Sequence, residues 1–371
     1  QLPYNYEVAV TTVTKDGTES AMSAPFLYSK KPYANEWMHI EFDNNVLKRD
    51  EYSTKYVWPC DLDGDGEMDE FIVDRLGSGA EEEVGDDDDT SGTTTATAHK
   101  LQAYDIDGTL LWTIALGPNV NISSGQNDMV TVCDIDCDGK AEVIIKSSDG
   151  TRFWDKANET WGKYVFGKTT GDVDGDGIID YCASTNTKHN PPFYISVIDG
   201  LTGEEKVSTE LKYSEVTDGE DTYTRDNKDS YMGNKGYYQM GGHFAICYDG
   251  VHPYVAMKCL DRDTNGKHHD YIFAFGYDWV NGKPTNFRHF YTWSRNDKTP
   301  WPAEFHGNRV ADVDGDGIDE LCPGAFAVNP WKDMVSSPGV GHGDRFTYTD
   351  IDPERPGMEA VKKAVAKGNV A

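Results

Sequence analysis

The chain has 371 residues, with 64 Asp and Glu against 34 Lys and Arg, so its formal net charge is −30. This excess of negative charge excludes a simple electrostatic binder of nucleic acid or of anionic membrane surfaces. Hydrophobic residues make up 37% of the chain, enough for a folded core, and no apolar run reaches the roughly 20 residues of a membrane-spanning helix.

The first 31 residues are predicted to form a short β segment. Residues 6–10 alternate in polarity, a Lys15-Asp16-Gly17 turn follows, and residues 20–23 resemble the last strands of a fibronectin type III module. We therefore expect a fibronectin-III-like segment over residues 1–31 and a larger domain over residues 32–371.

The larger domain is predicted to be all-β. Its apolar residues come in runs of three to five bounded by Gly, Asp, Asn or Pro, for example residues 71–73, 143–145 and 271–275. Such runs are typical of short strands. Residues 359–366 are the exception, since their pattern favours a short helix. The seven cysteines show no paired spacing and are expected to be free thiols, mostly buried.

An acidic repeat recurs along this domain. It reads Asp-x-Asp-x-Asp-Gly, then two residues and an acid, and a strand follows. Carboxylates at positions 1, 3 and 5 surround one point, Gly at position 6 allows a sharp turn, position 7 offers its backbone carbonyl, and the acid at position 9 closes the sphere. Calcium suits this oxygen set better than zinc. An EF-hand is excluded because position 12 is never Glu and no helices flank the loops.

Four copies of the repeat are complete and a fifth is degenerate. The predicted calcium ligands of the complete copies are Asp61, Asp63, Asp65, Glu67 and Asp69; Asp134, Asp136, Asp138, Lys140 and Glu142; Asp172, Asp174, Asp176, Ile178 and Asp180; and Asp312, Asp314, Asp316, Ile318 and Glu320. The degenerate copy offers Asp261, Asp263 and Asn265, with His269 at position 9. We expect several bound Ca²⁺ ions. Most of them should stabilise the loops, and at most one or two should lie near the catalytic residues.

A second repeat lies between the acidic loops. The pairs Asp107-Gly108 and Asp199-Gly200 are predicted to supply the positive φ angles of tight hairpin turns. Calcium-type loops that alternate with strands and Asp-Gly hairpins are typical of propeller blades. The predicted fold is therefore an all-β, calcium-rich β-propeller.

The order of motifs from about residue 56 to residue 359 is similar to that of the rhamnogalacturonan lyases of polysaccharide lyase family 11. The landmarks are Leu101–Trp112, Asp138–Thr151, Val310–Glu320, the Gly-x-Gly-His-Gly-Asp motif at 339–344 and the Asp-x-Asp-Pro-x-Arg-Pro-Gly-x-Glu motif at 350–359. This resemblance implies an eight-bladed propeller, of which the chain covers about the first half to two-thirds. It also implies β-elimination next to galacturonate in the rhamnogalacturonan backbone of pectin.

The resemblance also implies candidate residues for that chemistry. β-Elimination beside a uronate needs a neutralised carboxylate, a base for the C5 proton and a group that protonates or stabilises the departing O4. The catalytic candidates are Lys146, at the end of the 143–145 strand run, with His306 and His342. The candidate substrate-binding residues are Asp149, Gly233, Asn234, Asn308 and Asp344.

Three departures from the family pattern keep alternatives open. The chain reads Gly233-Asn234-Lys235-Gly236 where the family has Gly-Asn-Arg-Val, it reads Glu304-Phe305-His306-Gly307-Asn308 where the family has Gly-Asn-His-Asn, and it stops soon after Glu359. The alternatives are a lyase for another uronate polysaccharide and a non-catalytic, calcium-stiffened propeller that binds glycans or proteins. The expected partners are an acidic plant cell-wall polysaccharide and a further chain or partner that completes the propeller. We expect a secreted or cell-surface protein whose export signal has been removed.

Overall fold

The computed structural model describes residues 6–28, 39–48, 51–77, 99–116, 130–148, 151–155, 157–164, 193–210, 244–262, 268–294, 304–324, 326–336, 343–355 and 357–364. It divides the chain into two compact units, Gln1–Glu41 and Phe42–Ala371. The described residues form strands, turns and bends but no α-helix. The all-β prediction is therefore confirmed, and no described helix is available to span a membrane.

The first unit contains one described hairpin. Strand β1 (Tyr6–Val8) pairs antiparallel with β2 (Phe26–Tyr28), and a single bridge joins Val13 to Glu19 nearer the turn. Gly17 has a φ of 83°, in the left-handed region that glycine adopts without steric cost. The Lys15-Asp16-Gly17 turn lies where the sequence predicts it.

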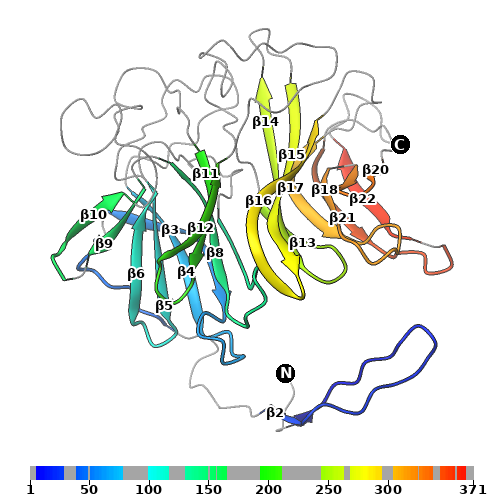
Figure 1. Cartoon of the computed structure of the whole chain (residues 1–371), viewed down its shortest axis with the longest axis horizontal. Helices are drawn as coiled ribbons and strands as arrows, with labels where there is room; N and C mark the ends of the chain where they lie inside the picture. Colours follow the sequence, from blue (N-terminus) through cyan, green and yellow to red (C-terminus); the bar gives the residue numbers. More distant parts are fainter. Residues whose placement is uncertain are drawn as a thin grey trace. The chain divides into compact units, whose positions relative to one another are not determined.

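The described residues of the second unit form four sheets (Figure 1). The first has the order β10 (Thr160–Tyr164), β9 (Arg152–Asp155), β6 (Leu110–Ala115), β5 (His99–Asp105), β4 (Glu70–Gly77) and β3 (Tyr52–Cys60). The second has the order β12 (Glu205–Glu210), β11 (Phe193–Asp199), β8 (Glu142–Ser148) and β7 (Val130–Cys133). The third runs β13 (Phe244–Tyr248), β14 (Pro253–Arg262), β15 (His268–Val280) and β16 (Lys283–Ser294).

The fourth sheet contains two groups of strands that meet at one parallel pairing. Its order is β20 (Asp333–Ser336), β19 (Ala327–Asn329), β18 (Glu320–Gly324), β17 (Glu304–Ala311), β21 (Gly343–Thr349) and β22 (Glu359–Ala364). Strands β17 and β21 are parallel and meet at Phe305 and Gly343. All other described strand pairs of the unit are antiparallel, and most of them join consecutive strands as hairpins.

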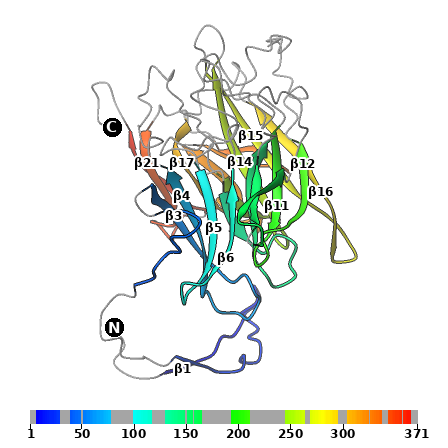
Figure 2. The same ribbon diagram turned by 90° about the vertical axis from the view of Figure 1, so that its left-hand side faces the viewer.

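The first strands of the four sheets contact one another in succession: β3 with β7, β7 with β13, and β13 with β17. Each of them leads into a loop or turn at the same end of its sheet (Figures 1 and 2). The described strands of this unit thus form a succession of four sheets whose strand pairs are almost all antiparallel.

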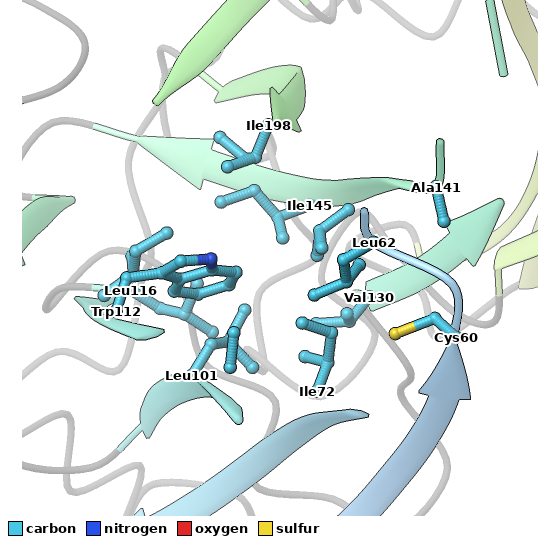
Figure 3. Packing of buried hydrophobic residues seen from close by; sticks show 13 residues of the cluster. Cys60, Leu62, Ile72, Leu101, Trp112, Leu116, Val130, Ala141, Ile145 and Ile198 are labelled. Carbon is cyan, nitrogen blue, oxygen red and sulfur yellow. The ribbon is translucent and has the colours of Figure 1, made fainter. Parts of the chain in front are cut away.

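The core lies between successive sheets. Between the first two, Leu62, Ile72, Leu101, Ile145 and Ile198 are fully buried and pack into one cluster (Figure 3). Each such side chain contributes roughly 1.5–3 kcal/mol when removed from water. A second cluster of buried aliphatic and aromatic residues joins the second and third sheets. Packing between sheets therefore fixes the strands that carry the acidic loops.

The helix expected at residues 359–366 is wrong, because residues 359–364 form strand β22. This strand pairs antiparallel with β21 from Thr349↔Glu359 to Gly343↔Ala364. Ala and Lys favour helices, but the propensity difference is only tenths of a kcal/mol per residue and pairing with a neighbouring strand overrides it. Residues 365 and 366 lie outside the described part of the chain.

The two Asp-Gly hairpins differ in how they use glycine. At the β5–β6 turn Gly108 has a φ of 91° and its N–H donates to the Asp105 carbonyl at 2.9 Å, as predicted. At the β11–β12 turn the positive φ, 75°, belongs to Gly203 rather than to Gly200. Gly200 is required for another reason, because a Cβ there would lie 2.1 Å from the Ala141 carbonyl oxygen.

The cysteines whose side chains are described are all free thiols. Cys60, Cys247 and Cys322 are buried within strands, Cys133 is half-buried and Cys137 is exposed. Burial raises the pKa of the Cys60 thiol to about 12, so this group behaves as a small apolar side chain. The prediction of free thiols is confirmed for these five residues.

Candidate functional site

Three acidic loops gather carboxylate oxygens in the described part of the chain. They join the first strand of a sheet to the second: β3 to β4, β7 to β8, and β17 to β18. Within each group the carboxylate oxygens lie within 4.8 Å of one another: Asp61, Asp63 and Asp65; Asp134, Asp136 and Glu142; and Asp312, Asp314 and Asp316. An all-oxygen, carboxylate-rich donor set of this kind fits a hard cation such as calcium.

The first aspartate of each loop organises the turn. In the first loop the two carboxylate oxygens of Asp61 accept the backbone N–H groups of Gly64 at 2.7 Å and of Gly66 at 2.8 Å. Asp134 accepts from Asp138 and Gly139, and Asp312 from Gly315, Asp316 and Gly317, at 2.8–3.0 Å. Glycine at position 6 has a φ of 90–94° in all three loops, as the repeat predicts.

The residue at position 7 is held by the carboxylate at position 5. The backbone N–H groups of Glu67, Lys140 and Ile318 donate to Asp65, Asp138 and Asp316 at 2.8–2.9 Å. The loops are therefore built alike in backbone hydrogen bonding even though their seventh residues differ in charge. This similarity is consistent with a role for position 7 through its main chain.

A buried glutamate closes each loop from the first residue of the next strand. Oε2 of Glu142 accepts the N–H of Ile135 at 3.1 Å, and Oε2 of Glu320 accepts the N–H of Val313 at 2.8 Å. These side chains are 1% and 0% exposed. A carboxylate so placed links position 2 of the loop to the strand that follows it.

In the first loop this closing position belongs to Glu70 and not to the predicted Asp69. Glu70 is 6% exposed, begins β4, and accepts the N–H of Leu62 at 2.8 Å. Asp69 instead offers its backbone carbonyl to the N–H of Ile106 at 2.7 Å. The first loop is one residue longer than the others. The signal in the sequence was that Glu70, like Glu142 and Glu320, stands directly before an apolar run.

Burial raises the pKa of the closing glutamates. At Glu142 desolvation is the largest cause and neighbouring Asp136 adds to it, while a hydrogen bond from Lys206 opposes it, and the pKa is raised to about 7. The pKa values of Glu70 and Glu320 are raised too, again chiefly by desolvation. Keeping these carboxylates charged thus costs free energy that a nearby cation can offset.

A fourth loop, residues 350–359, has the same closing contact although the sequence does not mark it as a metal loop. Glu359 begins β22, and its Oε2 accepts the N–H groups of Ile351 at 3.0 Å and Asp352 at 3.3 Å. Its spacing from Asp350 equals that of Glu70 from Asp61. The acidic motif that served as a family landmark is therefore another strand-connecting loop.

Backbone hydrogen bonds join these loops across sheet boundaries. The N–H of Ala141 in the second loop donates to the Asp61 carbonyl at 2.8 Å, and the N–H of Asp319 donates to the Tyr248 carbonyl at 2.9 Å. In both cases the donor immediately precedes the closing glutamate. These two bonds connect each of the two loops to the neighbouring sheet.

The third sheet replaces the acidic loop with a tight turn. Asp249 accepts the N–H groups of Val251 and His252, and the His252 ring stacks on Trp279 at 3.9 Å between centroids. The degenerate repeat lies at the opposite end of this sheet, where β14 leads into β15 and Asp261 pairs with His269. Asp263 and Asn265 lie outside the described residues.

Other predicted site residues also lie outside the described part of the chain. They are the whole of the 172–180 repeat (Asp172, Asp174, Asp176, Ile178 and Asp180) together with Asp149, Gly233, Asn234 and His342. For His306 and Asp344 only the backbone is described. Their roles remain predictions.

The structure brings two of the predicted candidates onto neighbouring strands. His306 in β17 and Asp344 in β21 follow directly after Phe305 and Gly343, which pair across these parallel strands. Asn308 lies half-buried two residues further along β17. Lys146 lies within β8, which continues to Ser148, and its side chain is 0% exposed.

These candidates are remote from the described acidic loops. Lys146 is four residues from Glu142 along β8, and at about 3.3 Å per residue this separates them by roughly 13 Å. His306 is six residues from Asp312, or roughly 20 Å by the same measure. Calcium ligands lie within about 2.6 Å of the ion. A cation in these loops would therefore lie too far from Lys146 and His306 for either residue to lie in its coordination sphere.

Comparison with known proteins identifies relatives over most of the chain. The family model described as rhamnogalacturonan lyase family 11, C-terminal domain, matches residues 44–369. Rhamnogalacturonan endolyase YesW of Bacillus subtilis is 32% identical over 267 residues, which cover 70% of this chain and 37% of that protein. Rhamnogalacturonan exolyase YesX of the same organism is 30% identical over 315 residues, covering 83% and 44%.

Solved structures agree with the sequence comparison. The crystal structure of rhamnogalacturonan lyase YesW matches with a TM-score of 0.62 and 26% identity, over 95% of this chain and 54% of that one. The Bacillus licheniformis rhamnogalacturonan lyase PL11 matches with the same TM-score at 25% identity, over 96% and 54%. The chain therefore spans about half the length of these structures, and less than half of the two curated relatives.

Proposed function

The chain belongs to rhamnogalacturonan lyase family 11. We propose that it forms part of a calcium-dependent lyase that cleaves the rhamnogalacturonan backbone by β-elimination next to galacturonate. The observation that carries this proposal is the family match over residues 44–369, which includes every described acidic loop. The names of the two curated relatives, an endolyase and an exolyase, give the same substrate class. The polymer is too large to enter a cell, so we propose that the protein acts as a secreted or cell-surface enzyme.

We propose that the sheets are blades of a β-propeller and that the described acidic loops are structural calcium sites. Successive contacts among β3, β7, β13 and β17 support the first part. The second part rests on the convergence of carboxylates in each loop and on the hydrogen bonds that join neighbouring loops. Asp61, Asp136 and Asp314 represent the carboxylates that would hold the ions.

Lys146, His306 and His342 are the proposed proton-transfer groups. A base takes the C5 proton of galacturonate as the C4–O4 bond breaks, and an acid or a positive charge meets the departing oxygen. His306 and Asp344 stand on adjacent strands, which supports a shared role for these two stretches. When bound near the uronate, calcium would supply neutralisation of its carboxylate.

The test is incubation of the protein with rhamnogalacturonan I in calcium buffer, with polygalacturonate as the matched polymer that lacks rhamnose. We expect the absorbance of unsaturated uronate to rise with the first polymer only. A rise with polygalacturonate instead would favour a lyase for another uronate polysaccharide. Retention of polymer without any unsaturated product would identify a non-catalytic binder and overturn the proposal.

A further inference from the structure

Two of the acidic loops contain a lysine ammonium among their carboxylates. In the second loop Nζ of Lys206 lies 2.6 Å from Asp136 Oδ2, 2.8 Å from Glu142 Oε1 and 3.6 Å from Asp138 Oδ2. In the loop at 312–320, Nζ of Lys332 lies 2.6 Å from Asp314 Oδ2 and 2.5 Å from Asp316 Oδ2. Both ammonium groups thus contact residues that are predicted to bind calcium.

Each lysine is delivered by a distinct local structure. Lys206 is the extra residue of a β-bulge, because Val207 pairs with Val197 and Glu205 pairs with Ile198. A bulge of this kind redirects a side chain out of the regular alternation of the strand. Lys206 lies 70 residues after Asp136 in the sequence, so only the folded sheet brings the two side chains together.

Lys332 lies in the turn between β19 and β20, and Asn329 fixes that turn. The Asn329 side-chain oxygen accepts the N–H of Lys332 at 2.8 Å, while its amide nitrogen donates to the closing Glu320 at 2.5 Å. Asn329 is completely buried. The turn and the acidic loop are therefore held in register, which places the ammonium over the carboxylates.

The first loop differs from these two. Among the described residues, no lysine or arginine nitrogen lies within 4.0 Å of the carboxylates of Asp61, Asp63 and Asp65. The hairpin that occupies the place of the lysine-bearing turns carries Asp105 and Asp107 instead, and its Ile106 is bonded to the Asp69 carbonyl. This loop therefore has acidic neighbours where the other two have an ammonium.

We infer that Lys206 and Lys332 are tethered counter-ions that compete with calcium for their loops and set a lower calcium affinity there than at the Asp61 loop. The inference rests on the proposed calcium binding of the family. Without metal, the ammonium groups neutralise the loops at 134–142 and 312–320 and keep them closed. With metal, calcium must displace them, whereas no described ammonium lies within 4.0 Å of the carboxylates that calcium would meet in the Asp61 loop.

The test measures calcium binding by titration calorimetry, without polysaccharide, in the full chain and in Lys206→Gln and Lys332→Gln. Each variant should bind calcium about tenfold more tightly at one site, equivalent to the loss of one modest ion-pair competitor. In EGTA each should melt at a lower temperature than the wild type, and calcium should restore the difference. Lys206→Arg, which keeps the charge, should behave like the wild type in EGTA.

The control is Lys283→Gln, which removes an equal charge from an exposed position on the β15–β16 hairpin. It should leave calcium affinity and melting unchanged. Calcium binding in the wild type together with unchanged affinity in both lysine variants would overturn the inference while leaving the proposed lyase intact. Failure of Lys206→Gln or Lys332→Gln to fold even in calcium, or absence of calcium binding in every variant, would also overturn it.

Discussion

The indole N–H of Trp112 donates a 2.7 Å hydrogen bond to the carbonyl oxygen of Gly200, a residue 88 positions later in the sequence. This bond joins the first sheet to the β11–β12 turn of the second. Gly203 completes the contact, since a Cβ there would lie 2.7 Å from the indole ring. The sheet that carries the Asp61 loop is thus positioned against the sheet that carries the Asp134 loop by a buried, directional contact.

Trp112→Phe should destabilise the protein by about 2–4 kcal/mol, because it leaves the Gly200 carbonyl without its buried donor and also removes ring volume. Chemical denaturation measures the change. Trp331→Phe is the matched control, since Trp331 is 50% exposed and its substitution should cost less than about 1 kcal/mol. Equal losses in the two variants would contradict the role given to the indole N–H.

The difference between Asp69 and Glu70 supplies a second prediction. Glu70→Ala should cost about 1–3 kcal/mol, because the buried N–H of Leu62 loses its acceptor. Asp69→Ala should cost less, since the Asp69 backbone carbonyl still accepts from Ile106 after the substitution. Both variants are compared by denaturation in calcium buffer. A larger loss of stability in Asp69→Ala would show that Asp69, the acid at position 9 of the repeat, closes the loop and that Glu70 does not.

Removal of calcium should lower the melting temperature by more than about 5 °C. One site at a calcium concentration about 100-fold above its Kd contributes about 2.7 kcal/mol to the free energy of unfolding. In a large domain each kcal/mol shifts the melting temperature by about 2 °C or more. Calcium should restore the transition better than magnesium, which resists the irregular, low-symmetry coordination of such loops. An unchanged melting curve in EGTA, with metal analysis confirming that the ions have left, would refute structural calcium.

Local patterns predicted the strands, the acidic turns and both Asp-Gly hairpins, because these depend on residues that are close in sequence. They missed features that depend on pairing between distant segments. Glu70 closes its loop because β4 begins there, and Lys206 meets Asp136 only through a bulge in β12. Residues 359–364 have good helix formers, yet β21 supplies their backbone partners. Site residues set by such pairings need the folded structure.

Lys146 tests the proposed chemistry. If it transfers the proton, Lys146→Gln should lower kcat on rhamnogalacturonan by about 10²–10⁴ while KM changes little. Lys146→Arg preserves charge and tests whether positive charge alone suffices. Because the side chain is fully buried, melting curves must show that each variant is folded. A loss of activity that merely follows the loss of folded protein would assign Lys146 to the core instead.

Lys100 gives a prediction about pH. Its side chain is 2% exposed, and desolvation, with a smaller contribution from the charge of Arg152, lowers its pKa to about 7. The Tyr52 ring lies under the ammonium at 5.8 Å, which is too weak a contact to offset burial. In the unfolded chain the lysine would keep its ordinary pKa of about 10.4.

Between pH 7 and about 10 the unfolded chain therefore binds a proton at Lys100 that the folded chain has released, so stability rises with pH over this window. Lys100→Met keeps the apolar stem and removes the charge. It should be more stable than the wild type near pH 7 by about 4 kcal/mol, and this advantage should shrink steadily towards pH 10. Denaturation at several pH values measures it, with exposed Lys283→Met as the control whose difference from the wild type stays constant. An advantage for Lys100→Met that is equally constant from pH 7 to pH 10 would show that Lys100 keeps its proton in the folded protein.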